Sequence, residues 1–189
     1  MHTENAIEEI IHNFQNLKKQ SQQIETIAKA WIQALEQGKK ILFCGNGGSA
    51  ADCQHLSAEL IGRYKLNRPA LASVSLTTDT SALTAIGNDF GFEQIFARQV
   101  EGLGQEGDVL VGISTSGNSK NILSAFEMAK KKKLLTIAFT GETGGQMKNI
   151  ADICLCVPST ITNNIQEMHI ATGHILCDMV EKHFFAKNI

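Results

Sequence analysis

The chain has 189 residues, of which 43% are hydrophobic and 19% are charged, and its formal net charge is −2. These values are typical of a globular protein with one core, and the slightly acidic balance disfavours nucleic acid as a partner. The sequence has no apolar signal-peptide core and no run of 18 apolar residues, so we expect a cytoplasmic protein with no membrane partner. Five scattered cysteines without a Cys-x-x-Cys pair fit reduced thiols in that compartment.

Helical periodicity dominates the first part of the chain. Apolar residues recur with helical spacing between residues 4 and 37, which predicts two helices or one bent helix. Gly38 follows and is expected to end the second helix. We therefore expect residues 1–37 to form a helical extension, and residues 38–189 to form the α/β core and C-terminal helix of the same single domain.

From residue 38 onward, short apolar runs alternate with helical stretches. The apolar runs cover residues 41–44, 71–76, 108–114, 134–139 and 152–157, and the helical stretches cover residues 49–61, 79–86, 93–101, 119–131 and 145–149. This alternation predicts an α/β fold in which a parallel sheet carries helices on both faces. A last helix, roughly 164–185, is largely apolar, and a partner subunit is the simplest way to bury it together with the N-terminal helices.

The stretch "STSGNS", residues 114–119, lies between the third apolar run and a helix. Its hydroxyl groups and the free N–H groups at a helix start favour a bound anion. It contains no lysine and does not match the nucleotide-binding P-loop. Simple N-capping needs only one such residue, so this density of hydroxyl and amide side chains indicates a site for one phosphomonoester.

The stretch "GNGGSA", residues 45–50, follows the first apolar run. Its three glycines allow the backbone to approach a ligand closely or to adopt positive φ. Because it does not match G-x-G-x-x-G, this stretch alone leaves open a ligand site or an ordinary turn. In a doubly wound sheet both turns would lie beyond the carboxyl ends of the strands, where ligands bind.

Two groups of metal-ligating residues lie far apart in the sequence. His55 and Glu59 are four residues apart on a predicted helix and therefore share one face. Imidazole and carboxylate both ligate divalent metals, with zinc the leading candidate, although this pair alone is more typical of a surface ion pair. The last helix adds Gln166, His169 and His174 to an otherwise apolar surface, which favours a shared polar site.

The spacing of Gln166 and His174 raises a geometric difficulty. Eight residues separate them, which is about 12 Å along a straight helix and about 80° around it. Two such residues cannot easily ligate one ion. Either Gln166 lies at an irregular start of the helix, or the two residues serve different parts of the pocket.

The stretch "GNDFGFEQIF", residues 87–96, is predicted to be a polar turn that leads into the apolar face of a helix. Asn88 and Asp89 can bind sugar hydroxyls there. They can equally serve as turn and capping residues, and the sequence does not separate the two interpretations.

Four stretches together resemble the sugar isomerase (SIS) domain family, and within it the branch that isomerises sedoheptulose 7-phosphate: "CGNGGSAAD", "GNDFGFEQIF", "GDVLVGISTSGNS" and "IQEMHIATGHILCDMVE". The resemblance covers about residues 5–185, with the motifs in family order. It implies a three-layer, doubly wound, flavodoxin-like fold with a five-stranded parallel sheet, and a homotetramer with active sites between subunits. It also implies a product, D-glycero-D-manno-heptose 7-phosphate, that feeds heptose precursors for lipopolysaccharide, capsule or related surface glycans.

The resemblance also implies roles for individual residues. One zinc ion per subunit would be held by His55, Glu59, Gln166 and His174. The phosphate would be held by Ser114, Thr115, Ser116 and Ser119. The remaining substrate contacts would come from Asn46, Gly47, Gly48, Glu59, Asn88, Asp89 and Gln166. Glu59 and His174 would be the catalytic pair.

These residue types suit the implied reaction. Moving a proton between C1 and C2 through an enediol needs a base, an acid and stabilisation of the developing negative charge. Glu59 suits the role of base, His174 suits the role of acid, and a divalent ion can stabilise the charge. Two alternatives stay open at this point. One is a non-catalytic binding protein, similar to the replication-initiator-associating SIS proteins, which lack the acid–base pair. The other is an isomerase of another sugar phosphate.

Overall fold

A five-stranded parallel sheet forms the centre of the computed structural model, which describes residues 2–186. The strands are β1 (Ile41–Gly45), β2 (Ser73–Ser75), β3 (Val109–Ile113), β4 (Leu135–Thr140) and β5 (Ile153–Cys156). Their order across the sheet is β2-β1-β3-β4-β5, and each neighbouring pair is parallel. This is the flavodoxin-like, doubly wound order, as predicted, and its topological switch point lies between β1 and β3.

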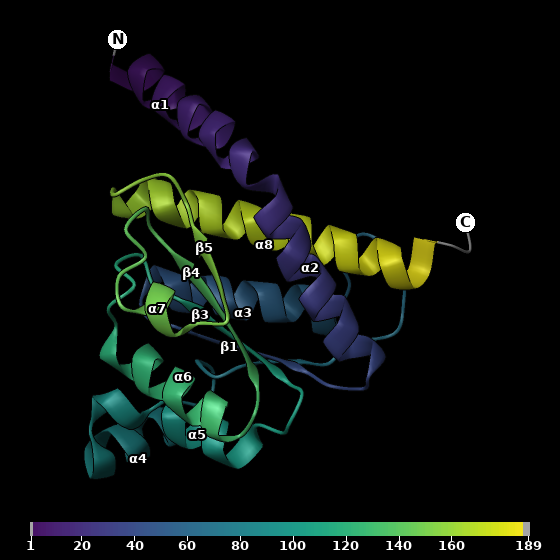
Figure 1. Cartoon of the computed structure of the whole chain (residues 1–189), viewed down its shortest axis with the longest axis vertical. Coiled ribbons are helices and arrows are strands. Elements are labelled where there is room, and N and C mark those ends of the chain that lie inside the picture. The colour runs from purple at the N-terminus through teal and green to yellow at the C-terminus, as the bar shows by residue number, and fades with distance from the viewer. Residues whose placement is uncertain (1, 187–189) are drawn as a thin grey trace.

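Helices cover both faces of the sheet and complete a three-layer fold (Figure 1). One layer contains α2 (Ser21–Glu36), α3 (Gly48–Ile61) and α8 (Thr162–Phe185). The other contains α4 (Thr80–Phe90), the 3-10 turn η2 (Phe92–Gln94), α5 (Ala97–Leu103), α6 (Lys120–Lys131) and α7 (Met147–Ile150). Because successive strand residues point to opposite faces, Ile41 and Phe43 join the core under the first layer, whereas Leu42 and Cys44 join the core under the second.

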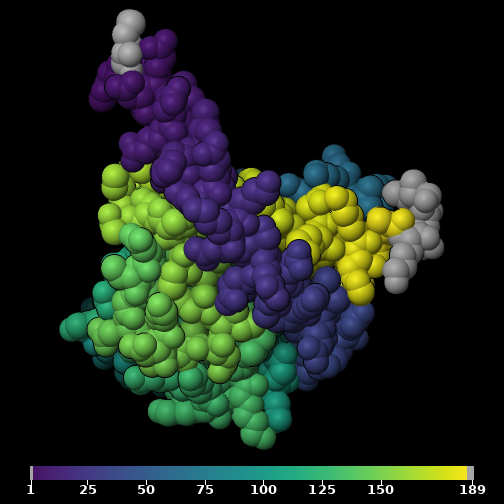
Figure 2. All heavy atoms as spheres, turned by 45° about the horizontal axis from the view of Figure 1, so that its top comes forward, coloured from purple at the N-terminus to yellow at the C-terminus, as the bar shows by residue number. Residues whose placement is uncertain are grey.

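Two helices precede the sheet, as the periodicity predicts. The first, α1 (His2–Leu17), leads through the 3-10 turn η1 (Lys18–Gln20) into α2. Helix α2 packs on the sheet, where the Trp31 ring meets the Phe43 ring edge-on at 5.5 Å between centroids. Helix α1 projects away from the α/β body (Figures 1 and 2). Its apolar face remains exposed at Ile7, Ile11 and Phe14.

The free side of β5 is covered by side chains from the N-terminal helices. The Gln20 amide donates to the carbonyl of Cys156 at 2.5 Å, and the Gln23 amide donates to the carbonyl of Cys154 at 3.3 Å. The Sγ atoms of Cys154 and Cys156 lie 3.6 Å apart, so the two thiols share one face of the strand, as their alternation predicts.

The last helix finds most of its packing partners within its own chain. Met168, Leu176 and Val180 on α8 are buried in the core shared with α2 and α3, whereas Ile175 is exposed. The apolar side of α8 that faces α2 and α3 is therefore buried within one chain, whereas a partner subunit for its exposed residues and for α1 stays a prediction. None of the helices within residues 2–186 is both long and apolar enough to cross a bilayer.

Several predicted elements differ from the structure, and the predicted helix 93–101 is divided into η2 and α5. The run 71–76 forms only the short edge strand Ser73–Ser75, because the Leu71 N–H is bonded to the Leu60 carbonyl at the end of α3. The predicted turn at residues 87–90 belongs to α4, which ends only at Gly91, where φ is +87°. Gly87 is tolerated inside the helix, since an internal glycine costs only about 1 kcal/mol relative to alanine.

Candidate active site

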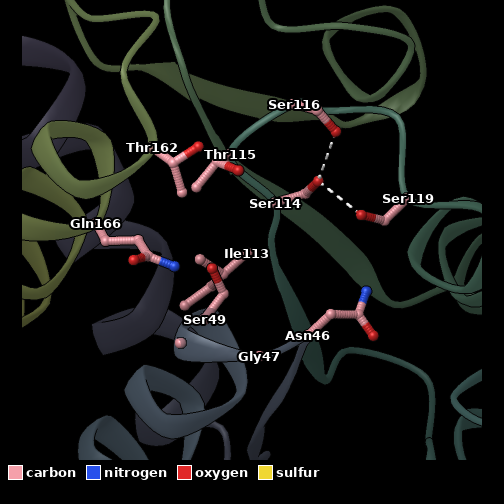
Figure 3. A pocket seen from close by; sticks show the side chains of 11 residues that line it. Asn46, Gly47, Ser49, Ile113, Ser114, Thr115, Ser116, Ser119, Thr162 and Gln166 are labelled. Carbon is pink, nitrogen blue, oxygen red and sulfur yellow. Dashed lines mark hydrogen bonds between the residues drawn. The ribbon is translucent and has the colours of Figure 1, made fainter.

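The loop after β3 gathers hydroxyl groups at the carboxyl edge of the sheet. The Ser114 Oγ lies 2.9 Å from the Ser119 Oγ and 3.5 Å from the Ser116 Oγ (Figure 3). Ser119 occupies the N-cap position of α6, but its hydroxyl makes no capping hydrogen bond to this helix. The hydroxyls therefore face one another rather than completing a helix cap, and the first N–H groups of α6 are available to an anion.

The shape of this loop depends on Gly117. Its φ is +66°, and a Cβ at this position would lie 2.1 Å from the backbone oxygen of Gly144. No side chain fits there, so glycine is required both for the backbone angle and for the close approach of the neighbouring loop. The Asn118 side chain donates to the Ser116 carbonyl and accepts from the Gln146 N–H, which fixes the loop further.

The glycine turn after β1 lies opposite the hydroxyl loop. Gly47 adopts φ +55° and precedes α3, which begins at Gly48. The two turns meet because β1 and β3 are neighbours in the sheet and both run toward the same edge. The prediction that both turns lie beyond the carboxyl ends of their strands is therefore confirmed.

Between the two turns lies a cavity of about 280 Å³. Most of its lining residues have polar side chains, and they come from the turn after β1, α3, the end of β3, the hydroxyl loop and the start of α8 (Figure 3). The lining residues are Asn46, Gly47, Gly48, Ser49, Ile113, Ser114, Thr115, Ser116, Ser119, Thr162 and Gln166. Its position beyond the carboxyl ends of β1 and β3, at the switch point of the sheet, is where doubly wound proteins bind their ligands.

Residues missed by the sequence reading contribute to this cavity. Ser49 and Thr162 line it directly. Asn121, on α6, is 3% exposed and forms a reciprocal amide pair with Asn46, with N···O distances of 3.0 and 2.8 Å. Thr162 lies just before the predicted start of the last helix, at about residue 164, and is the first residue of α8 in the structure. The pairing of Asn121 with Asn46 has no sequence signal.

A second polar group lies farther along the seam between α3 and α8. The His55 Nε2 lies 3.2 Å from the Glu59 Oε1 and 3.2 Å from the His174 Nε2. One ligand atom from each of the three side chains falls within 4.8 Å of the others. The structure thus joins the His55–Glu59 pair of α3 to His174 of α8, which we call the His–Glu–His triad.

The electrostatics of the His–Glu–His triad suit a divalent cation. Burial lowers the pKa of His174, the neighbouring His55 lowers it further, and Glu59 partly opposes this shift. A neutral imidazole has a lone pair for a metal, and the carboxylate supplies negative charge. Two imidazoles and one carboxylate are ligands that zinc prefers, so the residues present fit this ion.

The remaining candidate residues have different surroundings. Gln166 lies beside Gly48 in the cavity, within regular helix, about 12 Å along α8 from His174. Of the two explanations for their spacing, an irregular helix start is therefore wrong. Asn88 and Asp89 occupy the exposed last turn of α4, where the Asn88 amide donates to the Asp89 carboxylate at 2.8 Å.

His169 serves packing within the chain. It is completely buried, and its Nε2 lies 3.1 Å from the backbone oxygen of Thr140 at the end of β4. Because a carbonyl only accepts hydrogen bonds, Nε2 carries the proton. Burial lowers the pKa of His169 to about 4, against a smaller opposing effect of this hydrogen bond. His169 therefore joins α8 to the sheet as a neutral residue.

Comparisons with known proteins agree with this geometry. A profile of the SIS domain family matches residues 4–141. A phosphoheptose isomerase of Akkermansia muciniphila is 56% identical over 181 residues, which cover 96% of this chain and 96% of that relative. One from Helicobacter pylori strain P12 is 55% identical and covers 97% of this chain and 92% of that relative. The solved structure of a phosphoheptose isomerase from Neisseria gonorrhoeae superposes with a TM-score of 0.91 at 45% identity. The match covers 96% of this chain and 97% of that chain.

Proposed function

This chain belongs to the SIS domain family, and we propose that it converts sedoheptulose 7-phosphate to D-glycero-D-manno-heptose 7-phosphate. Its relatives identify it as a sugar-phosphate isomerase of heptose synthesis. The observation that carries the proposal is the placement of the hydroxyl-lined cavity and the His–Glu–His triad along one pair of helices, α3 and α8. We also propose that the chain acts as a single domain in the cytoplasm and supplies heptose for lipopolysaccharide, capsule or related glycans.

The phosphate is proposed to bind at the loop after β3. Ser114, Ser116 and Ser119 present hydroxyls to one another at hydrogen-bonding distances, and Thr115 lines the same cavity. An anion there would also meet the positive end of α6. Binding at the phosphate supplies free energy that orients the reacting carbons at the other end of the sugar.

The sugar chain is proposed to run past the glycine turn. Asn46, Gly47 and Gly48 line the cavity next to the phosphate loop, with Gln166 facing them from α8. We propose that Asn88 and Asp89, on an exposed turn, contact sugar hydroxyls in the assembled enzyme. Short polar side chains and exposed backbone groups suit a ligand with several hydroxyls.

Proton transfer is proposed for Glu59 and His174. Glu59 removes a proton from C1, and His174 donates its ring N–H proton to the C2 carbonyl oxygen, giving the enediol. Loss of the proton from the C1 hydroxyl and return of a proton to C2 then give the aldose. His174 retains one N–H as a neutral imidazole, so its lowered pKa is compatible with a donor role.

A zinc ion, one per subunit, is proposed at the His–Glu–His triad, with Gln166 as a fourth ligand. When bound, the ion would polarise the substrate carbonyl and stabilise negative charge on its oxygen. Glu59 must have a free carboxylate oxygen to act as base, and His174 must have a free N–H to act as acid, so His55 is the most permanent protein ligand of the set.

We propose a homotetramer with active sites between subunits. The separation of Gln166 and His174 along α8 supports this arrangement, because four ligands of one ion need not then come from one chain. The exposed apolar face of α1 also supports it, since Ile7 and Ile11 are each 51% exposed.

An isomerase assay on a panel of ketose phosphates, run with and without a chelator, tests the proposal. Activity on sedoheptulose 7-phosphate that disappears on chelation and returns with Zn²⁺ is expected. Pentulose and hexulose phosphates are expected to react at least about tenfold more slowly in kcat/KM, equivalent to about 1.4 kcal/mol. Faster turnover of a shorter ketose phosphate would contradict the substrate assignment, and full activity in chelator would contradict the metal.

A further inference from the structure

A buried ion pair connects α8 with the loop that follows α3. The Arg68 Nε donates to the Glu181 Oε1 at 2.8 Å, and the two side chains are only 1% and 3% exposed. Glu181 lies on α8 seven residues after His174, which is two helical turns along the same face. The ion pair is therefore on the side of α8 that carries the His–Glu–His triad.

The loop 62–70 is folded around the Glu181 carboxylate. Backbone N–H groups of Tyr64, Lys65 and Leu66 donate to its two oxygens at 3.1, 2.8 and 2.9 Å. Together with Arg68, four donors converge on one buried carboxylate. Such an arrangement fixes the backbone of the loop, because any movement would leave a buried charge without its donors.

The same guanidinium also holds the end of α3. One Arg68 nitrogen, Nη2, donates to the Glu59 carbonyl and another, Nη1, donates to the Leu60 carbonyl, both at 2.8 Å. These carbonyls belong to the last turn of α3, where they lack partners within the helix. Arg68 thus links the residue proposed as base to α8, which carries the residue proposed as acid.

The folded loop places an aromatic ring on the triad. The Tyr64 ring is stacked on the His174 ring, with centroids 5.9 Å apart and an angle of 28° between planes. The His55 ring meets His174 edge-on at 4.9 Å from another direction. The plane of the His174 imidazole is thereby confined on two sides.

We propose that Tyr64, Arg68 and Glu181 are positioning residues of this enzyme. The Arg68–Glu181 pair sets the separation of α3 and α8 at the His–Glu–His triad and holds Tyr64 against His174, so that the imidazole keeps its orientation toward Glu59. None of the three residues lines the phosphate cavity. The inference rests on the proposed function in one respect, that the His–Glu–His triad is the reacting centre.

The experiment compares Arg68→Lys, Tyr64→Leu and Tyr64→Phe with wild type. Lysine keeps the charge but cannot reach Glu181 and both carbonyls together, and leucine removes the ring. Asn67→Ala is the matched control, because Asn67 is an exposed neighbour in the same loop and belongs neither to the ion pair nor to the ring contact. Three quantities are measured on the full-length protein: kcat and KM for the sugar phosphate, and the NMR shift of the His174 ring Cε1–H. This resonance is assigned by its loss in His174→Gln.

We expect Arg68→Lys and Tyr64→Leu to lower kcat by about tenfold or more with KM changed less than about twofold, as for other residues that orient catalytic groups. Tyr64→Phe is expected to recover most of the kcat lost in Tyr64→Leu. The His174 resonance should move in Arg68→Lys, although that substitution does not touch the ring.

Unchanged kcat and an unchanged His174 resonance in Arg68→Lys would overturn the proposal. The proposal would also fail if kcat in Arg68→Lys and Tyr64→Leu fell only in proportion to the fraction of unfolded protein, while the His174 resonance of the folded protein did not move. If wild type turns over no sugar phosphate, the proposed substrate fails. The resonance in Arg68→Lys then still decides whether the ion pair positions His174.

Discussion

Gly48 and Gln166 lie so close together that a Cβ on Gly48 would be 2.6 Å from the Gln166 Nε2. The approach joins the first residue of α3 to α8 at the wall of the phosphate cavity. A side chain at residue 48 would therefore act directly on the placement of Gln166.

We predict that Gly48→Ala displaces Gln166 and raises KM for the sugar phosphate by about tenfold, since one misplaced polar contact costs about 1–2 kcal/mol. Steady-state kinetics measure the effect. Gly102→Ala on α5 is the matched control, because nothing lies within 4 Å of a Cβ there. An unchanged KM in Gly48→Ala would show that Gln166 takes no part in binding.

Glu59→Gln is predicted to lower kcat by roughly 10²–10⁴-fold while phosphate binding persists, because an amide cannot accept the substrate proton. Turnover and the inhibition constant of inorganic phosphate are the two measurements. Glu101→Gln, at an exposed residue of α5, serves as control. Turnover close to wild type in Glu59→Gln would remove this residue as the base.

Ser119→Ala is predicted to raise KM by about tenfold and to leave the free energy of unfolding within about 0.5 kcal/mol of wild type. The reason is that the Ser119 hydroxyl faces Ser114 and does not cap α6. Kinetics and urea unfolding separate the two roles. A loss of about 1 kcal/mol in stability with unchanged KM would instead identify Ser119 as a simple cap.

Asn121→Ala is predicted to raise KM for the sugar phosphate, although Asn121 does not line the cavity. Asn121 makes both hydrogen bonds of the amide pair with Asn46, so its loss frees the Asn46 side chain to rotate. An increase of about fivefold to tenfold corresponds to the 1–1.4 kcal/mol of one to two net hydrogen bonds. Asn149→Ala, at an exposed residue of α7, is the control, and equal KM values in the two variants would refute the role.

His169 is predicted to make the fold less stable at mildly acidic pH. Its pKa is lowered to about 4 in the folded state, whereas an unfolded histidine titrates near 6.5. Below pH 6.5 the unfolded chain gains a proton that the folded chain does not, so stability falls as pH falls from about 6.5 to about 4, by about 3 kcal/mol in total. Urea unfolding at pH 7.5 and pH 5 measures this, and His169→Gln should show a smaller pH dependence. An equal pH dependence in the variant would assign the effect to other groups.

Local patterns in the sequence predicted the sheet well and drew attention to the hydroxyl groups of the loop after β3. Strands β1, β3 and β4 are buried apolar runs, β5 is a half-buried apolar run, and each can be recognised by itself from the sequence. The loop at residues 114–119 carries its hydroxyls within six consecutive positions, so its character did not depend on distant contacts. His55 and Glu59 share a helix face for the same local reason.

Features that arise from long-range contacts could not be predicted. The Arg68–Glu181 pair joins residues 113 positions apart, and no periodicity relates them. Likewise, both Gly87 and Gly91 are helix breakers in sequence, but only Gly91 adopts positive φ, and so α4 extended through the predicted turn. The contact of His174, rather than Gln166, with the His55–Glu59 pair depends on how α8 packs against α3.

The glutamine side chains that cover β5 bear on aggregation. A parallel sheet ends in two rows of backbone groups that invite pairing with another chain. On the β5 side, Gln20 and Gln23 occupy carbonyls of Cys156 and Cys154 that an intruding strand would need. The helical extension therefore protects the β5 edge from pairing with another chain. Its removal would expose this edge strand as well as part of the core.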